Sequence, residues 1–401
     1  MVAESATTSH SCVPRSGPAR ETDPGGWSRL IYVRGAVLRT VGDRLEVRDD
    51  LRLAPPRAGE VLVRVAASGV CHSDVSVQDG TVALPTPIML GHEGAGVIEA
   101  LGPDVDGVMV GDHVVLSFTP MCGHCFHCVR DEGFLCDDGR NRFAGRLIDG
   151  TCRFSLDGID VHQMAMCGTF AERTVVPASS VVPIPRDMPL HLAALLGCGV
   201  LTGVGAACNT ARIRPGDRVV VVGCGGVGLN VIQGARIAGA AEIIAVDPVA
   251  EKRTLAARFG ATSVIDPDAG DPVEQVRAAT GGRGADVVFE VVGREATISQ
   301  ALDMTRRGGQ LVLVGVPDVA HVPSVLERLY YSARTITACS YGSVNVRRDV
   351  PLLIDRYRRG ELLLDELVTE EIGLDRINDA MTDLASRTAT VRRVIRFDRE
   401  R

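Results

Sequence analysis

The segment Gly216-Asp-Arg-Val-Val-Val-Val-Gly-Cys-Gly-Gly-Val-Gly228 decides the fold of this 401-residue chain. Its apolar run, 219–222, leads directly into a Gly-x-Gly-x-x-Gly turn, and a helical pattern at 229–238 follows. A second apolar run then ends at Asp247, 19 residues after Gly228. Such a turn alone has little specificity, but a strand, a turn, a helix and a strand-end acid in this order indicate a dinucleotide-binding site.

Each glycine of the turn has a physical role beside a bound dinucleotide. Gly223 permits the tight turn, Gly225 lets the backbone approach a pyrophosphate, and Gly228 allows close packing of helix and strand. The helix N-terminus offers unpaired N–H groups to the phosphates. Asp247 would accept hydrogen bonds from ribose hydroxyls and repel a 2′-phosphate, so NAD is favoured over NADP. A purely structural glycine turn is the alternative.

The wider pattern predicts two interleaved domains. A parallel sheet with helices is expected over 200–340, because strand-like runs alternate with helical stretches there, at 219–222, 243–246, 287–291, 311–314 and 335–338. Short alternating segments broken by Gly and Pro predict a β-rich, barrel-like domain over 29–199, to which the chain's end, 341–401, returns. Residues 1–28, rich in Ser, Thr, Pro and Gly, are expected to form a disordered extension.

Composition excludes several classes of partner. The chain has 43 basic and 50 acidic residues and a formal net charge of −7, whereas nucleic-acid and anionic-membrane surfaces need an excess of Lys and Arg. No uninterrupted apolar stretch reaches the length of a membrane span, and no run resembles a signal peptide. We therefore expect a soluble, cytoplasmic protein without nucleic-acid or membrane partners.

Twelve cysteines in a chain too long to need disulfide staples point to metal or redox chemistry. Four of them lie within fifteen residues, at Cys122, Cys125, Cys128 and Cys136. These spacings allow one loop to wrap a tetrahedral Zn²⁺, and four thiolates would saturate the ion, so a structural site is predicted. His124 and His127 are then expected to face solvent. Disulfides and a nucleic-acid-binding zinc ribbon are the alternatives.

A second set of metal-binding residue types is dispersed along the chain. Cys71 lies in Val70-Cys-His-Ser-Asp74, His92 in Gly91-His-Glu-Gly-Ala-Gly96, and Cys198 in Gly197-Cys-Gly199. Spacing alone does not join them. Together with the four-cysteine loop, the glycine turn and Asp247, however, they fall in the order and spacing of the zinc-dependent medium-chain alcohol dehydrogenases, which the chain resembles over about residues 30–401. The overall sequence pattern is most similar to that of the actinobacterial branch that includes nicotinoprotein alcohol dehydrogenases. The formaldehyde dehydrogenases are near relatives of that branch.

The resemblance implies a GroES-like catalytic domain, a Rossmann coenzyme domain, NAD, and two Zn²⁺ per chain. It implies catalytic zinc ligands at Cys71, His92 and Cys198. The implied roles of their neighbours are an acid behind the metal at Glu93, a hydroxyl that contacts the bound alcohol at Ser73, a partner of the histidine ligand at Asp74, and a contact with coenzyme phosphate at His72. Phe118 resembles a wall of the substrate pocket, although plain core is the alternative. The implied cofactor-binding residues are Gly223, Gly225, Gly226, Val227, Gly228, Asp247, Lys252, Val314 and Arg392.

The implied activity is hydride transfer between NAD and a primary alcohol, with aryl and allylic alcohols included, to give the aldehyde. Ser76 stands where the family's relay histidine is expected, and Cys224 stands inside the glycine turn as a small buried hydrophobe or a redox-sensitive thiol. Oxidation of a thiol–formaldehyde adduct is the runner-up, because Arg140 matches an anion-binding position while its acidic partners are unmatched. A zinc ribbon without catalysis ranks last. The resemblance also implies a homodimer or homotetramer, joined through the strand at 335–338.

Overall fold

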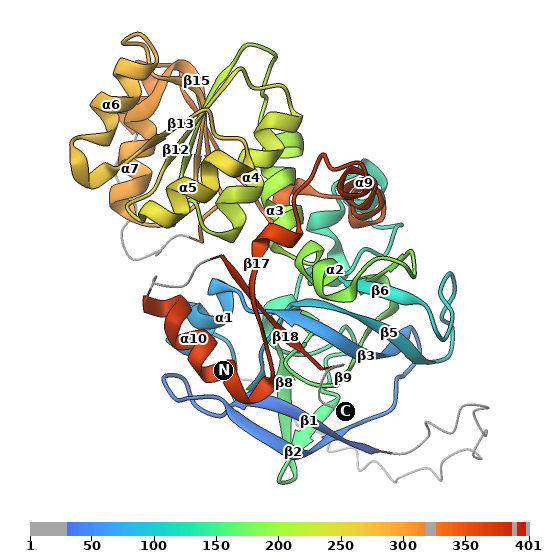
Figure 1. Ribbon diagram of the computed structural model, residues 1–401. Coiled ribbons are helices and arrows are strands. Elements are labelled where there is room, and N and C mark those ends of the chain that lie inside the picture. Colours follow the sequence, from blue (N-terminus) through green and yellow to red (C-terminus); the bar gives the residue numbers. More distant parts are fainter. Residues whose placement is uncertain (1–29, 317–325, 387–390, 398–401) are drawn as a thin grey trace, which may run out of the picture.

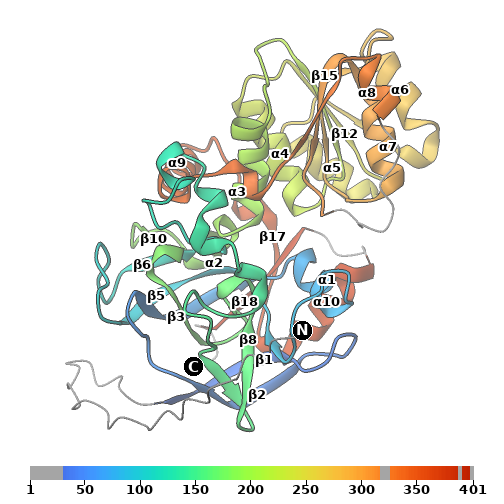
Figure 2. The same cartoon turned by 180° about the vertical axis from the view of Figure 1, so that it is seen from behind.

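The computed structural model describes residues 30–316, 326–386 and 391–397. Figures 1 and 2 show a mixed α/β body joined through α3 to a β-rich body that holds both ends of the described chain. The expected N-terminal extension, 1–28, lies outside the described residues.

The α/β body is a Rossmann fold, as the alternating pattern predicts. Its sheet is parallel throughout and has the order β13-β12-β11-β14-β15-β16. The strands are β11 (Arg218–Val222), β12 (Glu242–Val246), β13 (Ser263–Ile265), β14 (Ala285–Glu290), β15 (Thr305–Leu313) and β16 (Thr335–Ala338). The helices are α4 (Gly226–Ile237), α5 (Ala250–Phe259), α6 (Pro272–Ala279), α7 (Glu295–Met304) and α8 (Leu326–Tyr330). Alternate strand residues pack against α4 and α5 on one face and against α6 and α7 on the other.

The β-rich body combines a closed barrel, β1-β2-β7-β8-β4, with a sheet of order β10-β6-β5-β3-β18-β17, in which β9 also pairs with β3. The barrel strands are β1 (Ile31–Leu38), β2 (Glu46–Leu53), β4 (Ile88–Met89), β7 (Phe154–Leu156) and β8 (Ile159–Gln163). The sheet strands are β3 (Glu60–Gly69), β5 (Glu93–Leu101), β6 (His113–Leu116), β9 (Arg173–Pro177), β10 (Val181–Ile184), β17 (Val368–Ile372) and β18 (Arg392–Arg396). The helices are α1 (His72–Gln78), α2 (Leu190–Leu196), α3 (Gly199–Gly205), α9 (Val346–Arg358) and α10 (Ile377–Ser386).

The end of the chain is built into the sheet of the β-rich body. β18 pairs antiparallel with β3 and parallel with β17. The sequence pattern does not predict β17, because its sequence, Val-Thr-Glu-Glu-Ile, is mostly polar, as suits a strand at the end of the sheet order. This pairing brings Arg392, the first residue of β18, beside Val70 at the end of β3, where its Nη1 donates to the Val70 carbonyl at 3.3 Å.

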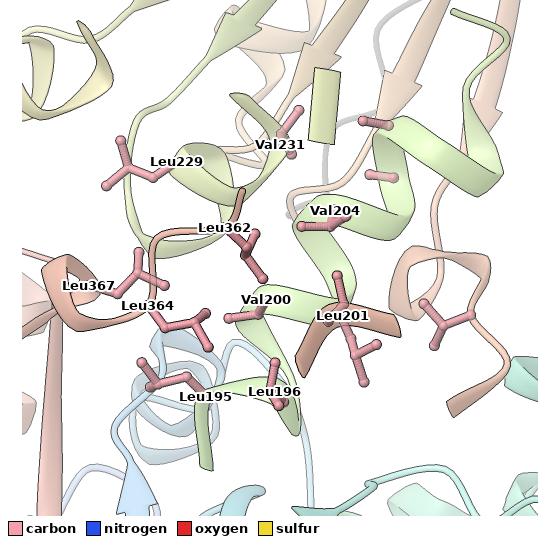
Figure 3. Packing of buried hydrophobic residues seen from close by; sticks show 14 of the residues in the cluster. Leu195, Leu196, Val200, Leu201, Val204, Leu229, Val231, Leu362, Leu364 and Leu367 are labelled. Carbon is pink, nitrogen blue, oxygen red and sulfur yellow. The ribbon is translucent and has the colours of Figure 1, made fainter. Parts of the chain in front are cut away.

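A continuous apolar core joins the two bodies (Figure 3). Members at the junction come from α2, α3, α4 and the segment 362–367, for example Leu196, Val200, Leu229 and Leu364. Burying each such side chain stabilises the folded state by about 1.5–3 kcal/mol. No single helix among the described residues is long and apolar enough to cross a membrane. The bent pair formed by Leu190–Leu196 and Gly199–Thr210 passes that test jointly, but most of it belongs to this core.

Candidate active site and zinc centres

The four-cysteine loop is arranged as a tetrahedral metal site. One sulfur from each cysteine lies within 4.8 Å of the other three. The Sγ atoms of Cys122 and Cys128 are 4.0 Å apart, and those of Cys125 and Cys136 are 3.9 Å apart. Tetrahedral zinc with Zn–S bonds near 2.3 Å requires sulfur–sulfur distances of about 3.8 Å. Every cysteine in the described part of the chain is free, so disulfides do not explain the cluster.

Backbone N–H groups of the loop point at its sulfurs. The N–H of Cys125 donates to Cys122 Sγ at 3.4 Å, and the N–H of Cys128 donates to Cys125 Sγ at 3.5 Å. A backbone hydrogen bond from Asp137 is the largest cause that lowers the pKa of Cys125, to about 6. His124 is exposed and His127 pairs with Glu132 at 3.2 Å, and neither belongs to the cluster.

The dispersed residues come together in a second cluster. Cys71 caps α1 after β3, His92 immediately precedes β5, and Cys198 lies between α2 and α3. Ligand atoms of these three residues and of Glu93 all lie within 4.8 Å of one another, and all four residues are buried. Two thiols and an imidazole are a donor set that suits zinc and leaves a position open. The fold therefore joins residues that spacing alone could not join.

Asp74 orients this cluster. Its Oδ1 lies 3.3 Å from His92 Nδ1 and accepts the N–H of Gly91 at 3.0 Å, while Oδ2 accepts the N–H of Cys71 at 2.9 Å. Burial lowers the pKa of His92, but the charge and hydrogen bond of Asp74 outweigh burial and raise it well above its usual value. With Nδ1 directed at Asp74, Nε2 is the nitrogen left for a metal.

Glu93 and Arg392 form a buried pair beside the cluster. Arg392 Nη2 lies 3.3 Å from Glu93 Oε1, without hydrogen-bond geometry, and neither Glu93 oxygen has a hydrogen-bond partner among the described residues. Burial raises the pKa of Glu93 to about 7. Arg392 also lies against the glycine turn, since a Cβ at Gly226 would be 2.5 Å from Arg392 Nε. One guanidinium thus touches both the metal cluster and the turn.

The glycine turn has the geometry of a phosphate cradle. Gly223 has φ +94°, a conformation that favours glycine, and a Cβ at Gly228 would lie 1.9 Å from the Gly223 carbonyl oxygen. A Cβ at Gly225 would meet no atom within 4 Å, so the backbone there faces open space. Helix α4 begins at Gly226 rather than at 229 as expected, which adds Gly226, Val227 and Gly228 to the first turn that faces the cradle.

Asp247 lies directly after β12 at the edge of this cradle. Its Oδ2 accepts the N–H of Cys224 at 2.8 Å and its Oδ1 accepts the N–H of Val249 at 2.9 Å. Lys252 is half-buried in the first turn of α5. Val314 follows β15, where its N–H donates to the Glu290 carbonyl at 2.8 Å. Asp247 and Val314 follow the carboxyl ends of two parallel strands of the same sheet, so both lie at its carboxyl edge.

Sequence reasoning missed Glu290 at the same edge. Its fully buried carboxylate accepts the N–H groups of Val292 and Gly293 and the hydroxyl of Thr297, so it fixes the loop after β14. Burial raises the pKa of Glu290. The only signal in the sequence was an acid at the end of an apolar strand.

An aromatic wall stands beside the metal cluster. The Phe118 ring lies edge-on to His92, with centroids 5.7 Å apart, and contacts Tyr341, with centroids 3.9 Å apart. Ser73 Oγ lies 3.8 Å from Cys71 Sγ. His72 is exposed at the start of α1, and its carbonyl accepts the hydroxyl of Ser76 at 3.1 Å. Phe118 also packs against three apolar clusters, so it is both a wall and a part of the core.

Known families match both bodies. Residues 57–186 match the alcohol dehydrogenase GroES-like domain, and residues 226–359 match the zinc-binding dehydrogenase domain. The matched regions contain all four loop cysteines, Cys71, His92 and the start of α4.

Similar proteins carry related names. The chain is 40% identical to an NDMA-dependent alcohol dehydrogenase of Amycolatopsis methanolica, over 88% of this chain and 95% of that one. It is 39% identical to an S-(hydroxymethyl)glutathione dehydrogenase of Escherichia coli, over 91% and 99%. The crystal structure of benzyl alcohol dehydrogenase from Acinetobacter calcoaceticus superimposes with a TM-score of 0.85 at 33% identity, over 92% and 99%. The chain therefore belongs to the zinc-dependent medium-chain alcohol dehydrogenase family, as an NAD-dependent oxidoreductase with zinc as its metal.

Proposed function

We propose that this alcohol dehydrogenase oxidises primary alcohols, aryl and allylic alcohols among them, to aldehydes. The observation that carries the proposal is the aromatic wall: the Phe118 ring lies edge-on to His92, and Tyr341 lies behind it. An alcohol whose oxygen reached the metal cluster would place its carbon skeleton against this wall. Aromatic rings prefer such edge-to-face or offset contacts, so a planar aryl or allylic group suits the site better than a charged one.

Cys71, His92 and Cys198 are the proposed ligands of the catalytic zinc. These residues would hold zinc as a Lewis acid, which would lower the pKa of an alcohol hydroxyl, and the coenzyme domain would hold NAD as the hydride acceptor. Asp74 keeps the imidazole aimed at the metal. Glu93 is proposed as the acid behind the metal, because its buried carboxylate has spare lone pairs and lies within 4.8 Å of the ligand atoms.

Ser73 is the proposed first group of the proton path, because its Oγ lies beside Cys71 Sγ and can exchange a proton with a substrate hydroxyl. Ser76 does not continue this path as a base, since its hydroxyl is engaged with the His72 carbonyl within α1. We propose that His72, exposed at the start of that helix, contacts coenzyme phosphate. A four-thiolate zinc at Cys122, Cys125, Cys128 and Cys136 would have no open position and is proposed to be structural.

The proposed coenzyme site extends from the cradle to the edge of the sheet. Its residues are Gly223, Gly225, Gly226, Val227, Gly228, Asp247, Lys252, Val314 and Arg392. The open space at Gly225 supports a pyrophosphate there, and the carboxylate of Asp247 disfavours a 2′-phosphate. Arg392, buried against Gly226, would supply the positive charge.

Several properties of the whole chain complete the proposal. We assign 29–199 with 341–401 to the catalytic domain and 200–340 to the coenzyme domain. A homodimer or homotetramer is proposed because β16 ends the parallel sheet and could pair with a second copy. A cytoplasmic location is also proposed. Size-exclusion chromatography with light scattering tests the assembly.

A thiol–formaldehyde adduct is the second candidate substrate. Arg140 favours it, because this exposed guanidinium has only Asp137, at 3.9 Å, as its ion-pair partner among the described residues. One experiment separates the two candidates: initial rates with a panel of aryl, allylic and aliphatic alcohols and NAD, beside formaldehyde with and without glutathione or mycothiol. Aryl alcohols are expected to be oxidised without a thiol. A strict thiol requirement with inert alcohols would reject the proposal in favour of the adduct.

A further inference from the structure

We infer that Tyr341 is a positioning residue, whose hydroxyl holds the segment that carries Cys198 in register with the aromatic wall at Phe118. This inference rests on the proposed function, because it assumes that Cys198 binds the catalytic metal. It adds to the metal cluster a residue from the segment between β16 and α9, where the chain returns from the coenzyme domain to the catalytic domain.

The hydroxyl of Tyr341 is buried and directed at two acceptors. Tyr341 is 4% exposed and lies where the chain crosses from β16 to α9. Its OH donates to the carbonyl oxygen of Gly197 at 2.6 Å and lies 3.3 Å from Ser117 Oγ. Ser117 Oγ itself donates to the Thr119 carbonyl at 2.8 Å, so it meets Tyr341 as an acceptor. The single phenol proton is therefore used mainly by Gly197 and only weakly shared with Ser117.

Each acceptor directly precedes a residue of the site. Gly197 is bonded to Cys198, and Ser117 is bonded to Phe118. The ring of Tyr341 meets the Phe118 ring at a centroid distance of 3.9 Å and an interplanar angle of 41°. One phenol thus touches the peptide before a metal ligand, the residue before the pocket wall, and the wall itself.

Gly197 has no side chain that could anchor the backbone at this point. A Cβ at this position would lie 2.7 Å from the Leu116 carbonyl oxygen, so the backbone passes close to the end of β6. Gly197 caps α2, and Cys198 follows with φ −144° and ψ −75°, outside helical geometry, before α3 begins. The Tyr341 hydroxyl supplies a buried donor at this break between two helices. Without it, the Gly197 carbonyl would lose its only side-chain partner among the described residues.

The crossover that carries Tyr341 is itself fixed against α3. A Cβ at Gly205 would lie 2.4 Å from the Gly342 carbonyl oxygen, which shows how closely the two backbones approach. The hydroxyls of Ser343 and Thr210 are 2.8 Å apart. The left-handed φ of +51° at Tyr341 is thereby maintained. The phenol side chain therefore connects the segment after β16, the last strand of the coenzyme sheet, to the peptide that precedes Cys198.

The test compares Tyr341→Phe with Tyr330→Phe, which makes the same chemical change at a residue that is 82% exposed. Zinc loss to a chelator is followed after NAD is removed, together with the thiolate-to-metal absorption of the cobalt-substituted protein and separate kcat and KM values. In Tyr341→Phe we expect zinc to leave the catalytic site about tenfold faster, because a buried acceptor is unpaired. The cobalt–thiolate band should shift, and kcat should fall more than KM rises. Loss from the four-cysteine site and all properties of Tyr330→Phe should stay as in the parent.

The outcomes separate this inference from the proposed function. If the parent enzyme binds two zinc ions and oxidises alcohols, but Tyr341→Phe has unchanged zinc loss, cobalt spectrum and kcat, the inference is wrong and the proposed function stands. If the parent lacks the second zinc or the activity, the proposed function fails. Should Tyr341→Phe not fold, replacing Tyr341 with 3-fluorotyrosine decides, because the analogue keeps the ring and the hydroxyl but changes the strength of the bond to the Gly197 carbonyl. A cobalt spectrum and kcat identical to those of the parent would then overturn the inference.

Discussion

Asp74 Oδ1 lies 3.3 Å from His92 Nδ1, and the other oxygen of the same carboxylate accepts the N–H of Cys71. One buried acid therefore aligns two of the three proposed ligands of the catalytic zinc. Asp74→Asn keeps the size of the side chain but removes its charge. We expect about a 10- to 100-fold loss of affinity at this site, as for other partners of metal-bound histidines.

The zinc affinity of Asp74→Asn is measured by competition with a chromophoric chelator and compared with that of the parent protein. The parent is expected to start with two zinc ions per chain. The four-cysteine loop serves as an internal control because Asp74 has no contact with it. Loss of both ions in parallel would instead indicate general unfolding and would contradict the specific role of Asp74.

The two zinc sites should respond differently to loss of one thiolate. Cys198→Ser removes a ligand of the open site, so turnover should fall below detection while the melting temperature changes little. Cys122→Ser breaks the closed site, whose binding energy contributes to folding, so the melting temperature should fall first. Calorimetry and zinc analysis of both variants make the comparison. Hydride transfer in a Cys198→Ser protein free of catalytic zinc would refute the assignment.

Asp247 should set the coenzyme preference. Its carboxylate is held at the cradle by the N–H groups of Cys224 and Val249, so its charge lies where we propose that the adenosine ribose binds. Asp247→Ser removes the repulsion of a 2′-phosphate and should raise the kcat/KM ratio of NADP to NAD by about tenfold or more, since each 1.4 kcal/mol is a factor of ten. Steady-state kinetics with both coenzymes measure it. An unchanged ratio would remove Asp247 from the site.

Whether a site could be assigned from the sequence depended on how far apart its residues lie along the chain. The four-cysteine loop and the glycine turn could be recognised because each is a contiguous segment. The chemistry of each depends on spacing within that segment. Cys71, His92 and Cys198 are separated by 21 and 106 residues, so only the family resemblance could join them before β3, β5 and the α2–α3 break did so in space.

Other structural features have no recognisable pattern in the sequence. Strand β17 is polar, and its identity depends on pairing with β18. The part played by Tyr341 depends on a backbone carbonyl 144 residues away, and backbone groups have no sequence signature. The apolar pattern predicts this strand only from residue 311, whereas β15 begins at Thr305, because Thr305-Arg-Arg-Gly-Gly309 lacks an apolar alternation.

A buried ion pair should control acid stability. Arg153, whose side chain is fully buried, contacts Glu60 of β3 and lies 2.7 Å from Asp149. Burial alone would raise the pKa of Asp149, but hydrogen bonds from Arg153 and Thr151 lower it. A lowered folded pKa gives stability that is fully present well above the unfolded value near 3.9 and is lost as the pH falls from that value toward the lower folded pKa.

Arg153→Met should therefore destabilise the fold at pH 7 by about 3–5 kcal/mol, because two acids lose their buried partner. The difference from the parent should shrink as the pH falls and the carboxylates become protonated. Urea unfolding at pH 7 and at pH 2.5, which lies below the unfolded pKa of the carboxylates, measures both effects. A constant difference between the two pH values would show that lost packing, not charge, is responsible.

Arg392 should couple the two cofactor sites, because the same guanidinium lies 3.3 Å from Glu93 and against the backbone of Gly226. Arg392→Gln removes the positive charge from the cradle, so NAD affinity should fall by roughly 10- to 100-fold, as for hydrogen bonds to charged groups. It also removes the charge that lowers the pKa of Glu93, so the pKa of this buried acid should rise further and its carboxyl group should reorient beside the zinc. Arg44→Gln, at an exposed arginine, is the matched control. Titration calorimetry with NAD and X-ray absorption at the zinc edge follow the two effects separately, and weaker NAD binding with an unchanged zinc spectrum would show that Arg392 serves the coenzyme alone.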